Sequence, residues 1–538
     1  MRNLVLVVLL VAAGTADLDA MQREPKRART DNPDAQRVID LLEHQLTAER
    51  IVPGEVIVKF REGAAIDPAA MLGPLSADTQ VRQTSGSELV VRLTGPQFDP
   101  QDAGSQDRTL EVIAELENNP DILWAHPNYM LQIVRDPNDD RFDEQWHYRE
   151  AAAAAGGLDL PDVWDQTLGA ADVVVAVIDT GILPNHPDIQ GSANLLAGFD
   201  MITDPAVAND GGGREADPTD PGDAVVVGEC GTDILGRPVP DRDRDDSWHG
   251  SHVAGTVGVG RTDNNIGVAG VNWNVSVVPV RVLGKCGGSI ADINDGIRWA
   301  AGLSVPGVPD NANPADVINL SLGGLGTCSN SPATQSAIDD AVDAGATVVV
   351  AAGNEAQDSA GFLPASCDNI ITVAASDLRG RLAQRYSNFG AGIDIMAPGG
   401  DVLRDDNNDG NPDGVLSYVD GGYDFYNGTS MAAPHVAGVA ALMLAVRPDL
   451  TPAEVETHLK DNARDRNSTQ CPRACGEGLL DPSFISDAAF RNGSGPVPDT
   501  PTDPVDPKEP DKVPAMSTVW QLLAVALVLT IAWIRRGA

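Results

Sequence analysis

Beyond about Pro137 the chain alternates between short apolar runs and segments with helical spacing. Continuous apolar runs of this kind are typical of strands that are buried on both faces of a parallel sheet. Their alternation with helices predicts an α/β fold, a three-layer domain with a mostly parallel sheet. In such a domain the reactive side chains gather at the carboxyl ends of the strands. The strand-like runs cover 173–178, 275–283, 316–322, 346–353 and 369–376, and the helix-like segments cover 249–260, 290–301, 333–345 and 429–446.

A small α+β unit is predicted ahead of this domain, over about residues 51–134. Residues 55–60 and 88–93 alternate apolar and polar side chains, as half-buried strands do. Residues 109–118 have helical spacing, and another strand-like run follows them. Taken alone, the sequence of this unit indicates no function.

Both ends of the chain carry targeting features. Residues 1–20 have the positive start, apolar run and small residues of a secretory signal peptide. Residues 491–515 form a Pro/Asp-rich linker, and residues 516–538 are an apolar segment closed by arginines. This last segment resembles bacterial C-terminal sorting tails. We therefore expect a secreted protein that this segment holds at the membrane of the cell envelope, either as a permanent anchor or as a tail that is later trimmed.

Composition narrows the possible partners. The 538 residues include 78 Asp and Glu against 37 Lys and Arg, a formal net charge of −41. A chain this acidic repels phosphate backbones, so we expect no nucleic-acid partner. Hydrophobic residues at 42% and charged residues at 21% are ordinary for globular proteins, which excludes global disorder.

Export would make the six cysteines candidates for disulfide bonds. Six cysteines allow about fifteen pairings, and we expect neighbours in order to pair. A zinc site is the less favoured alternative, because no histidine lies at ligand spacing beside them. The expected disulfides are Cys230–Cys286, Cys328–Cys367 and Cys471–Cys475.

Three polar residues lie where predicted strands end or predicted helices begin. Asp179 directly follows a strand-like run, His249 opens a helix-like segment, and Ser430 lies at the start of another. A serine hydroxyl becomes a nucleophile when an imidazole takes its proton and a carboxylate holds that imidazole in the right tautomer. The chain order acid, histidine, serine excludes the α/β-hydrolase arrangement, in which serine comes first.

The sequences around these three residues resemble the subtilisin-like serine peptidase family. They read DTG from Asp179, HGSHVAGT from His249 and NGTSMAAPHVAG around Ser430. The resemblance covers about residues 51–490 and implies a subtilisin-like fold for residues 136–490. It implies that Asp179 orients His249, that His249 is the general base and acid, and that Ser430 is the nucleophile.

The resemblance also implies an oxyanion site and a substrate site. Asn354 lies in the block AAGN, and its amide would donate to the oxyanion together with the backbone N–H of Ser430. His252 and His435, which lie in the same blocks as the triad, are expected to be packing or hydrogen-bonding residues. The residues whose backbone would pair with an extended peptide are Ser321, Leu322, Gly323 and Gly324.

Under the same resemblance, the unit at 51–135 is an inhibitory propeptide that occupies the active site until it is cut. Residues 129–135 would lie along the cleft, and cleavage would leave a mature start near Asp136 to Asn138. The predicted organisation is a signal peptide at 1–20, a charged segment at 21–50, the propeptide at 51–135, the peptidase domain at 136–490, the linker at 491–515 and the C-terminal segment at 516–538.

Calcium is the expected cofactor, in a structural role, and no organic cofactor is expected. Residues 405–413 alternate oxygen-bearing side chains with a glycine turn, a pattern seen in calcium loops. The glutamate that ends an EF-hand would fall at Leu416, so this is no complete EF-hand, and a solvated acidic loop is the alternative. The expected ligands are Asp405, Asn407, Asp409 and Asp413.

The predicted function is that of a secreted serine endopeptidase, made as a self-processing zymogen, that acts on proteins or peptides through an acyl-enzyme. One rival is a surface-anchored binding protein with an inactive peptidase fold, but each implied triad and oxyanion residue is present. A second rival, an esterase or lipase, is excluded by the chain order of the triad.

Overall fold

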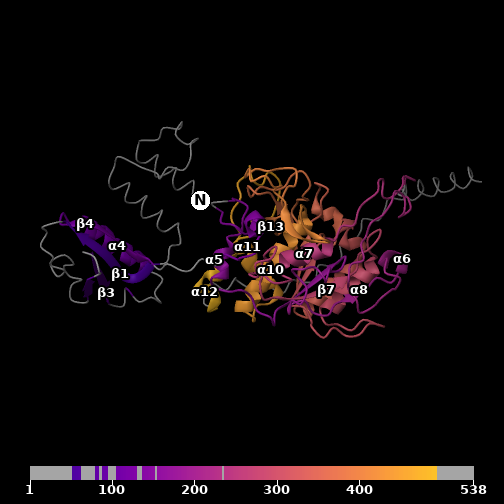
Figure 1. The fold of residues 1–538 in the computed structure, drawn as a ribbon, viewed down its shortest axis with the longest axis horizontal. Coiled ribbons are helices and arrows are strands. Elements are labelled where there is room, and N and C mark those ends of the chain that lie inside the picture. Colours follow the sequence, from indigo (N-terminus) through magenta and orange to yellow (C-terminus); the bar gives the residue numbers. More distant parts are fainter. Residues whose placement is uncertain are drawn as a thin grey trace, which may run out of the picture. The chain divides into compact units, whose positions relative to one another are not determined.

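The computed structural model describes residues 51–61, 79–83, 88–94, 98, 105–129, 136–151, 154–232 and 235–493. The chain divides into two compact units between Ile133 and Val134 (Figure 1). This division lies beside the boundary that was expected between propeptide and peptidase domain. The predicted signal peptide, charged segment and C-terminal segment, and the linker beyond residue 493, lie outside the described residues.

The first unit is an antiparallel sheet with one helix packed on it (Figure 1). Its elements are β1 (Ile51–Phe60), β2 (Thr79–Gln83), β3 (Glu88–Leu93), α4 (Ser105–Glu117) and β4 (Ile122–Tyr129). The strand order is β2-β3-β1-β4, and every neighbouring pair is antiparallel. Alternate residues of β1, Val56 and Val58, are fully buried in one cluster with Val112 and Leu116 of α4. The expected α+β unit is confirmed, with β2 as an additional strand.

The second unit is built on a seven-stranded sheet. Its strands are β5 (Val174–Asp179), β6 (Phe199–Asp200), β7 (Ser276–Arg281), β8 (Val317–Leu320), β10 (Thr347–Ala351), β12 (Ile371–Ser376) and β13 (Ile395–Pro398). The order is β13-β12-β10-β8-β5-β7-β6, and all neighbours are parallel. The predicted parallel sheet is confirmed. The edge strands β6 and β13 were not foreseen.

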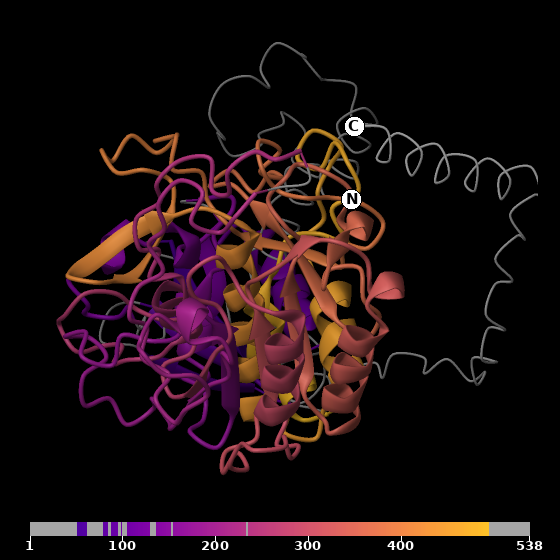
Figure 2. The same cartoon turned by 90° about the vertical axis from the view of Figure 1, so that its right-hand side faces the viewer.

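Helices cover both faces of this sheet (Figure 2). Val175 and Val177 of β5 belong to the core cluster that includes the helices on one face, whereas Ala176 and Ile178 belong to the cluster on the other face. The first face carries α7 (His249–Val257) and α10 (Thr429–Val446), and the second carries α8 (Ile290–Ala300) and α9 (Pro332–Asp343). The three-layer α/β architecture is therefore confirmed. Further helices are α5 (Leu160–Trp164), α6 (Pro205–Ala208), α11 (Pro452–Asp461) and α12 (Ala488–Arg491).

Helix α10 runs through the core. Among the described residues it is the one helix long and apolar enough to cross a membrane, and 83% of its apolar window is buried inside the domain, as in a core helix. Its first turn carries Ser430. The helix packs on β8, β10, β12 and β13, so the position of Ser430 is fixed by the central sheet.

Two short antiparallel ribbons complete the second unit. They are β9 (Gly324–Leu325) with β11 (Phe362–Leu363), and β14 (Val415–Val419) with β15 (Gly422–Tyr426). Disulfides join Cys230 to Cys286, Cys328 to Cys367 and Cys471 to Cys475, the same three pairs that the sequence analysis names.

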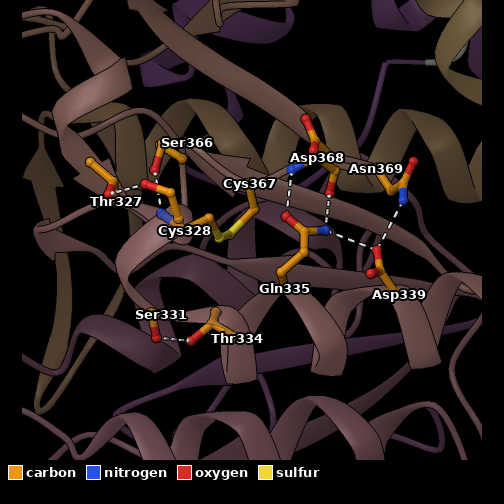
Figure 3. Close-up of a disulfide and its surroundings, with 12 residues drawn as sticks. Thr327, Cys328, Ser331, Thr334, Gln335, Asp339, Ser366, Cys367, Asp368 and Asn369 are labelled. Atoms are coloured by element: carbon orange, nitrogen blue, oxygen red, sulfur yellow. Dashed lines mark hydrogen bonds between the residues drawn. A yellow bond between two sulfur atoms is a disulfide. The ribbon is translucent and has the colours of Figure 1, made fainter. Parts of the chain in front are cut away.

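The second disulfide lies in a hydrogen-bonded junction (Figure 3). The Gln335 side chain of α9 donates to Asp339 (2.8 Å) and to the Asp368 carbonyl oxygen (3.0 Å), and it accepts from the Asp368 N–H (2.8 Å). Cys328 follows β9 and Cys367 follows β11, so the disulfide joins the two ends of the β9–β11 ribbon. The hydrogen bonds of Gln335 then attach this ribbon to α9.

Candidate active site

Asp179 and His249 form the centre of the site. Asp179 is the last residue of β5 and is fully buried, and His249 is the first residue of α7, with its side chain 23% exposed. His249 Nδ1 lies 2.8 Å from Asp179 Oδ1, which also accepts from the Thr180 N–H (2.7 Å). Because a carboxylate only accepts, Nδ1 carries the hydrogen, and Nε2 is left able to take a proton.

Nearby carboxylates tune the basicity of His249. Burial disfavours a charged imidazole, but Asp179 above all, and then Asp223 and Asp220, favour it, so the pKa of His249 is raised above its ordinary value. Asp220 is itself buried, and burial raises its own pKa to about 6. The imidazole is therefore a stronger base than a free histidine.

Ser430 lies at the same cavity as His249. Its hydroxyl donates to the Ser321 carbonyl oxygen (3.2 Å), and the Ser321 hydroxyl donates to the Ser430 carbonyl oxygen (2.8 Å). His249, Asn354 and Ser430 together line a cavity of about 360 Å³. Catalytic hydrogen bonds commonly form only in the complex with substrate, so the bond to Ser321 is compatible with later transfer of the hydroxyl proton to His249.

Asn354 is held so that its amide donors have no acceptor among the residues that the structure describes. Its Oδ1 accepts from the N–H (2.8 Å) and the hydroxyl (3.1 Å) of Thr429, which leaves Nδ2 available at the cavity. The N–H of Ser430 lies in the first turn of α10, where backbone N–H groups lack an intrahelical acceptor. Two donors at a helix N-terminus can stabilise an anion that develops between them.

The predicted substrate-binding residues lie beside these groups. Residues 321–324 follow β8 and line a second, larger cavity of about 700 Å³, which also reaches His249 and Ser430. Gly323 and Gly324 are exposed, so their backbone is accessible to a peptide. The structure thus brings together the triad residues, Asn354 and the 321–324 segment.

The other two histidines of the sequence blocks are buried structural residues. His252 Nε2 donates to the carbonyl oxygens of Val415 (3.0 Å) and Asp424 (3.2 Å), and burial lowers its pKa to about 3. His435 Nδ1 donates to the Met431 carbonyl oxygen (2.7 Å), and its Nε2 lies 2.9 Å from Nδ1 of the buried His147. Both are hydrogen-bonding residues, as the sequence analysis expects.

Sequence reasoning missed the residues that join the Asp179 and His249 segments. The Thr180 hydroxyl accepts from the Gly250 N–H (2.9 Å) and donates to Asp220 (2.7 Å). A Cβ atom on Gly250 would lie 2.3 Å from the Gly181 carbonyl oxygen, so only glycine allows this approach. Thr180 and Gly250 lie within the DTG and HGSHVAGT motifs, but Asp220 lies in a stretch of sequence with no recognisable motif.

The predicted calcium loop uses its side chains for its own hydrogen bonds. Asp405 accepts from the N–H groups of Asp409 (3.1 Å) and Gly410 (3.2 Å), and Asn407 donates to Asp409 (2.8 Å). The buried Asp413 accepts from the Asp406 N–H (2.8 Å). Within the described residues, no group of three or more His, Cys, Asp or Glu side chains is placed to hold a metal ion. Calcium binding at this loop stays a prediction, and it is the alternative to the site that is proposed below.

Two other carboxylates are buried beside the turn at residues 263–264. Asp139 and Asp188 are 5% and 1% exposed, and burial raises the pKa of each to about 6. Asp188 accepts from Asn264 Nδ2 (3.1 Å), and Asp139 accepts from the Asp263 N–H (2.8 Å). Buried carboxylates beside an amide-bearing turn supply the oxygen ligands that Ca²⁺ prefers. No local motif marks this pair, because its members come from separate segments.

Replacement of Gly250 tests the close packing at the site. We expect Gly250→Ala to cost about 1–3 kcal/mol of stability and to lower kcat/KM about tenfold or more, because the backbone at His249 must shift. Thermal unfolding of protein inactivated by a serine reagent, and peptide hydrolysis, measure the two effects. Gly361→Ala is the control, since a Cβ at Gly361 meets nothing within 4 Å. Equal stability and activity of the two variants would contradict the packing argument.

Comparisons with known proteins agree with this geometry. The model of the subtilase family, peptidase family S8, matches residues 170–478. The chain is 44% identical over 444 residues to an extracellular protease of Xanthomonas campestris pv. campestris, covering 81% of this chain and 72% of the relative. It is 40% identical over 394 residues to an extracellular basic protease of Dichelobacter nodosus, covering 72% of this chain and 62% of the relative.

A solved structure shows the same fold. The structure of a protease from Pseudoalteromonas arctica matches with a TM-score of 0.58 and 49% identity, covering 66% of this chain and 100% of that one. This likeness confirms the expected subtilisin-like fold. With the family model matching more than half of the chain, the conclusion is plain: this chain belongs to the subtilase family and is a serine peptidase.

Proposed function

We propose that this chain is a secreted endopeptidase that cleaves proteins and peptides through an acyl-enzyme on Ser430. The observation that carries the proposal is the 2.8 Å contact between His249 and the buried Asp179, at a cavity that Ser430 and Asn354 also line. Relatives named extracellular proteases support secretion. Retention at the cell envelope through residues 516–538 is part of this proposal and rests on the sequence.

The proposed reaction assigns its proton transfers, its nucleophile and its oxyanion donors to the residues of this site. His249 Nε2 takes the proton of Ser430 as the serine oxygen bonds to the carbonyl carbon of the substrate, and Asp179 stabilises the resulting imidazolium. The amide of Asn354 and the N–H of Ser430 donate to the oxyanion. His249 then gives the proton to the leaving amine as the C–N bond breaks. Water then bonds to the acyl carbon as His249 takes its proton, and the ester bond to Ser430 breaks as His249 returns that proton to the serine oxygen.

The first unit is proposed to be the inhibitory propeptide. It has its own sheet and its own buried cluster, and the chain divides beside residue 135, where self-cleavage is expected. A compact unit with its own core, directly ahead of the peptidase domain in the chain, suits a segment that occupies the active site and is then removed.

Ser430→Ala tests the proposed chemistry. We expect this substitution to abolish peptide hydrolysis and to leave an uncut precursor, because both reactions need the serine oxygen. Peptide hydrolysis and the intact mass of the purified protein measure the two results. Accumulation of a form starting near Asp136 in this variant would contradict self-processing. A parent protein that is folded and processed but inactive would instead favour the binding-protein rival.

The pH dependence of the parent protein follows from the raised pKa of His249. Protonated His249 cannot accept the serine proton, so kcat/KM rises as the pH rises through this pKa. We expect Asp223→Asn to move the midpoint of that rise to lower pH, since a carboxylate that favours the imidazolium is removed. Asp449→Asn is the control, because Asp449 follows the far end of α10, about 27 Å from its start. Equal midpoints for the two variants would refute this electrostatic account.

Structural calcium is proposed for the Asp139–Asp188 pair. We expect saturating Ca²⁺ to raise the unfolding temperature of the serine-inactivated protein by about 5–10 °C relative to EDTA, because an ion that binds only the folded state stabilises it. Asp188→Asn should reduce this increase, and Asp405→Asn should leave it unchanged. The reverse pattern would assign the ion to the 405–413 loop, and no effect of Ca²⁺ on the parent would exclude both sites.

A further inference from the structure

Asn388 carries a buried amide that no step of the proposed reaction uses. The residue lies between β12 and β13 and is fully buried, and it lines neither cavity at the active site. A buried side-chain amide has two donor hydrogens and an oxygen with two lone pairs, and such groups are normally satisfied by hydrogen bonds. The partners of this amide therefore show which part of the fold it holds in place.

All four hydrogen bonds of the Asn388 amide go to residues 352–357. Nδ2 donates to the Ala352 carbonyl oxygen and to a carboxylate oxygen of Glu355 (2.9 Å each). Oδ1 accepts from the N–H groups of Glu355 (3.1 Å) and Gln357 (2.9 Å). We call residues 352–357 the oxyanion turn, because they include the proposed oxyanion donor. The amide holds this turn on both sides of that donor.

The backbone around Asn388 is bonded to the same turn. The N–H of Asn388 donates to the Gly353 carbonyl oxygen (3.0 Å), and the N–H of Ala356 donates to the Tyr386 carbonyl oxygen (2.7 Å). Residues 386–388 are buried. The oxyanion turn is therefore held by a second buried segment as well as by β10, which it follows.

Gly353 shows how closely the amide fits against the turn. Its φ of +102° lies in the region that favours glycine, and a Cβ atom there would lie 2.3 Å from Asn388 Nδ2. The N–H of Gly353 donates to the Thr429 hydroxyl (3.1 Å), which itself donates to Asn354 Oδ1 (3.1 Å). Thr429 thus fixes the side-chain oxygen of Asn354, and Asn388 braces the backbone that carries it.

We propose that Asn388 is a positioning residue for the oxyanion site. It fixes the oxyanion turn so that Asn354 Nδ2 is aligned with the oxyanion before the reaction begins. The inference rests on the proposed function, in which Asn354 donates to the oxyanion. A donor of this kind stabilises the transition state more than the bound substrate, so its misalignment lowers kcat and changes KM little.

Asn388→Asp is the first test, because an ionised carboxylate keeps the size and the acceptor oxygen of the side chain but has no donor hydrogen. We expect kcat for a peptide substrate, per serine titrated with a covalent reagent, to fall about 10- to 50-fold, with KM within about twofold of the parent. The expected fall is smaller than the roughly 10²- to 10³-fold loss that follows outright removal of an oxyanion donor.

Asn311→Asp is the matched control. Asn311 is also buried, and its Nδ2 donates to the carbonyl oxygens of Trp299 and Ala300 (3.2 Å each) at the end of α8. This substitution removes the same kind of bonds from a turn that carries no proposed catalytic group. We expect the parental kcat for this variant. A similar fall of kcat in both variants would overturn the proposal.

The effect of Asn388→Asp should also depend on Asn354. In the Asn354→Ala background we expect Asn388→Asp to change kcat less than about twofold, because the donor that it positions is already absent. A residue with a merely structural role would lower kcat by the same factor in both backgrounds. That result, or a parental kcat in Asn388→Asp alone, would overturn the proposal.

Glu355 decides the question if the Asn388 variant does not fold. Glu355 is exposed, and Glu355→Gln keeps an acceptor for Asn388 Nδ2 whereas Glu355→Ala does not. We expect kcat to be about twofold to fivefold lower in Glu355→Ala than in Glu355→Gln. Equal kcat values would overturn the proposal. A parent protein that cleaves no peptide, or a parental kcat in Asn354→Ala, would instead refute the proposed function or its oxyanion site.

Discussion

The hydrogen bond between Asp179 and His249 is the interaction on which the rest of the site depends. A buried carboxylate is costly unless its charge is compensated. Oδ1 of Asp179 has two donors, Thr180 and His249, whereas its Oδ2 is buried without a hydrogen-bond partner in the described structure. The negative charge is therefore best compensated when His249 becomes protonated. A general base that must take the proton of a serine needs an environment that favours its protonated form in this way.

The fold supplies the geometry for that interaction. Strand β5 ends at Asp179, Asn354 follows β10, and α10 begins beside Ser430, so parallel strands and buried helices deliver all of these residues to one edge of the sheet. The walls of the cleft are less regular, and disulfides hold them. Cys230–Cys286 fastens the segment around residue 230 to the turn after β7, and Cys328–Cys367 fastens the β9–β11 ribbon. A rigid centre is thus combined with walls built from loops, where specificity can vary.

Much of this architecture was predictable because its signals are local. Buried parallel strands appear as apolar runs, and the triad residues lie within short motifs next to strand ends or helix starts. The β14–β15 ribbon and the edge strands have no such signal, since their positions depend on contacts with distant segments. The same holds for Asp139 and Asp188, which only folding brings to one turn. Conversely, the calcium-like spacing at 405–413 is local, yet in the structure its side chains bond to their own loop.

The most direct test of the central claim is labelling by a fluorophosphonate reagent, followed by intact mass and peptide mapping. An activated serine should give one adduct on the folded protein, located on the peptide that contains Ser430. The adduct should be lost in His249→Ala and after denaturation, because reactivity depends on the assembled imidazole and carboxylate. The absence of an adduct on folded, processed protein held in calcium would contradict the account. Equal labelling of His249→Ala would contradict it as well.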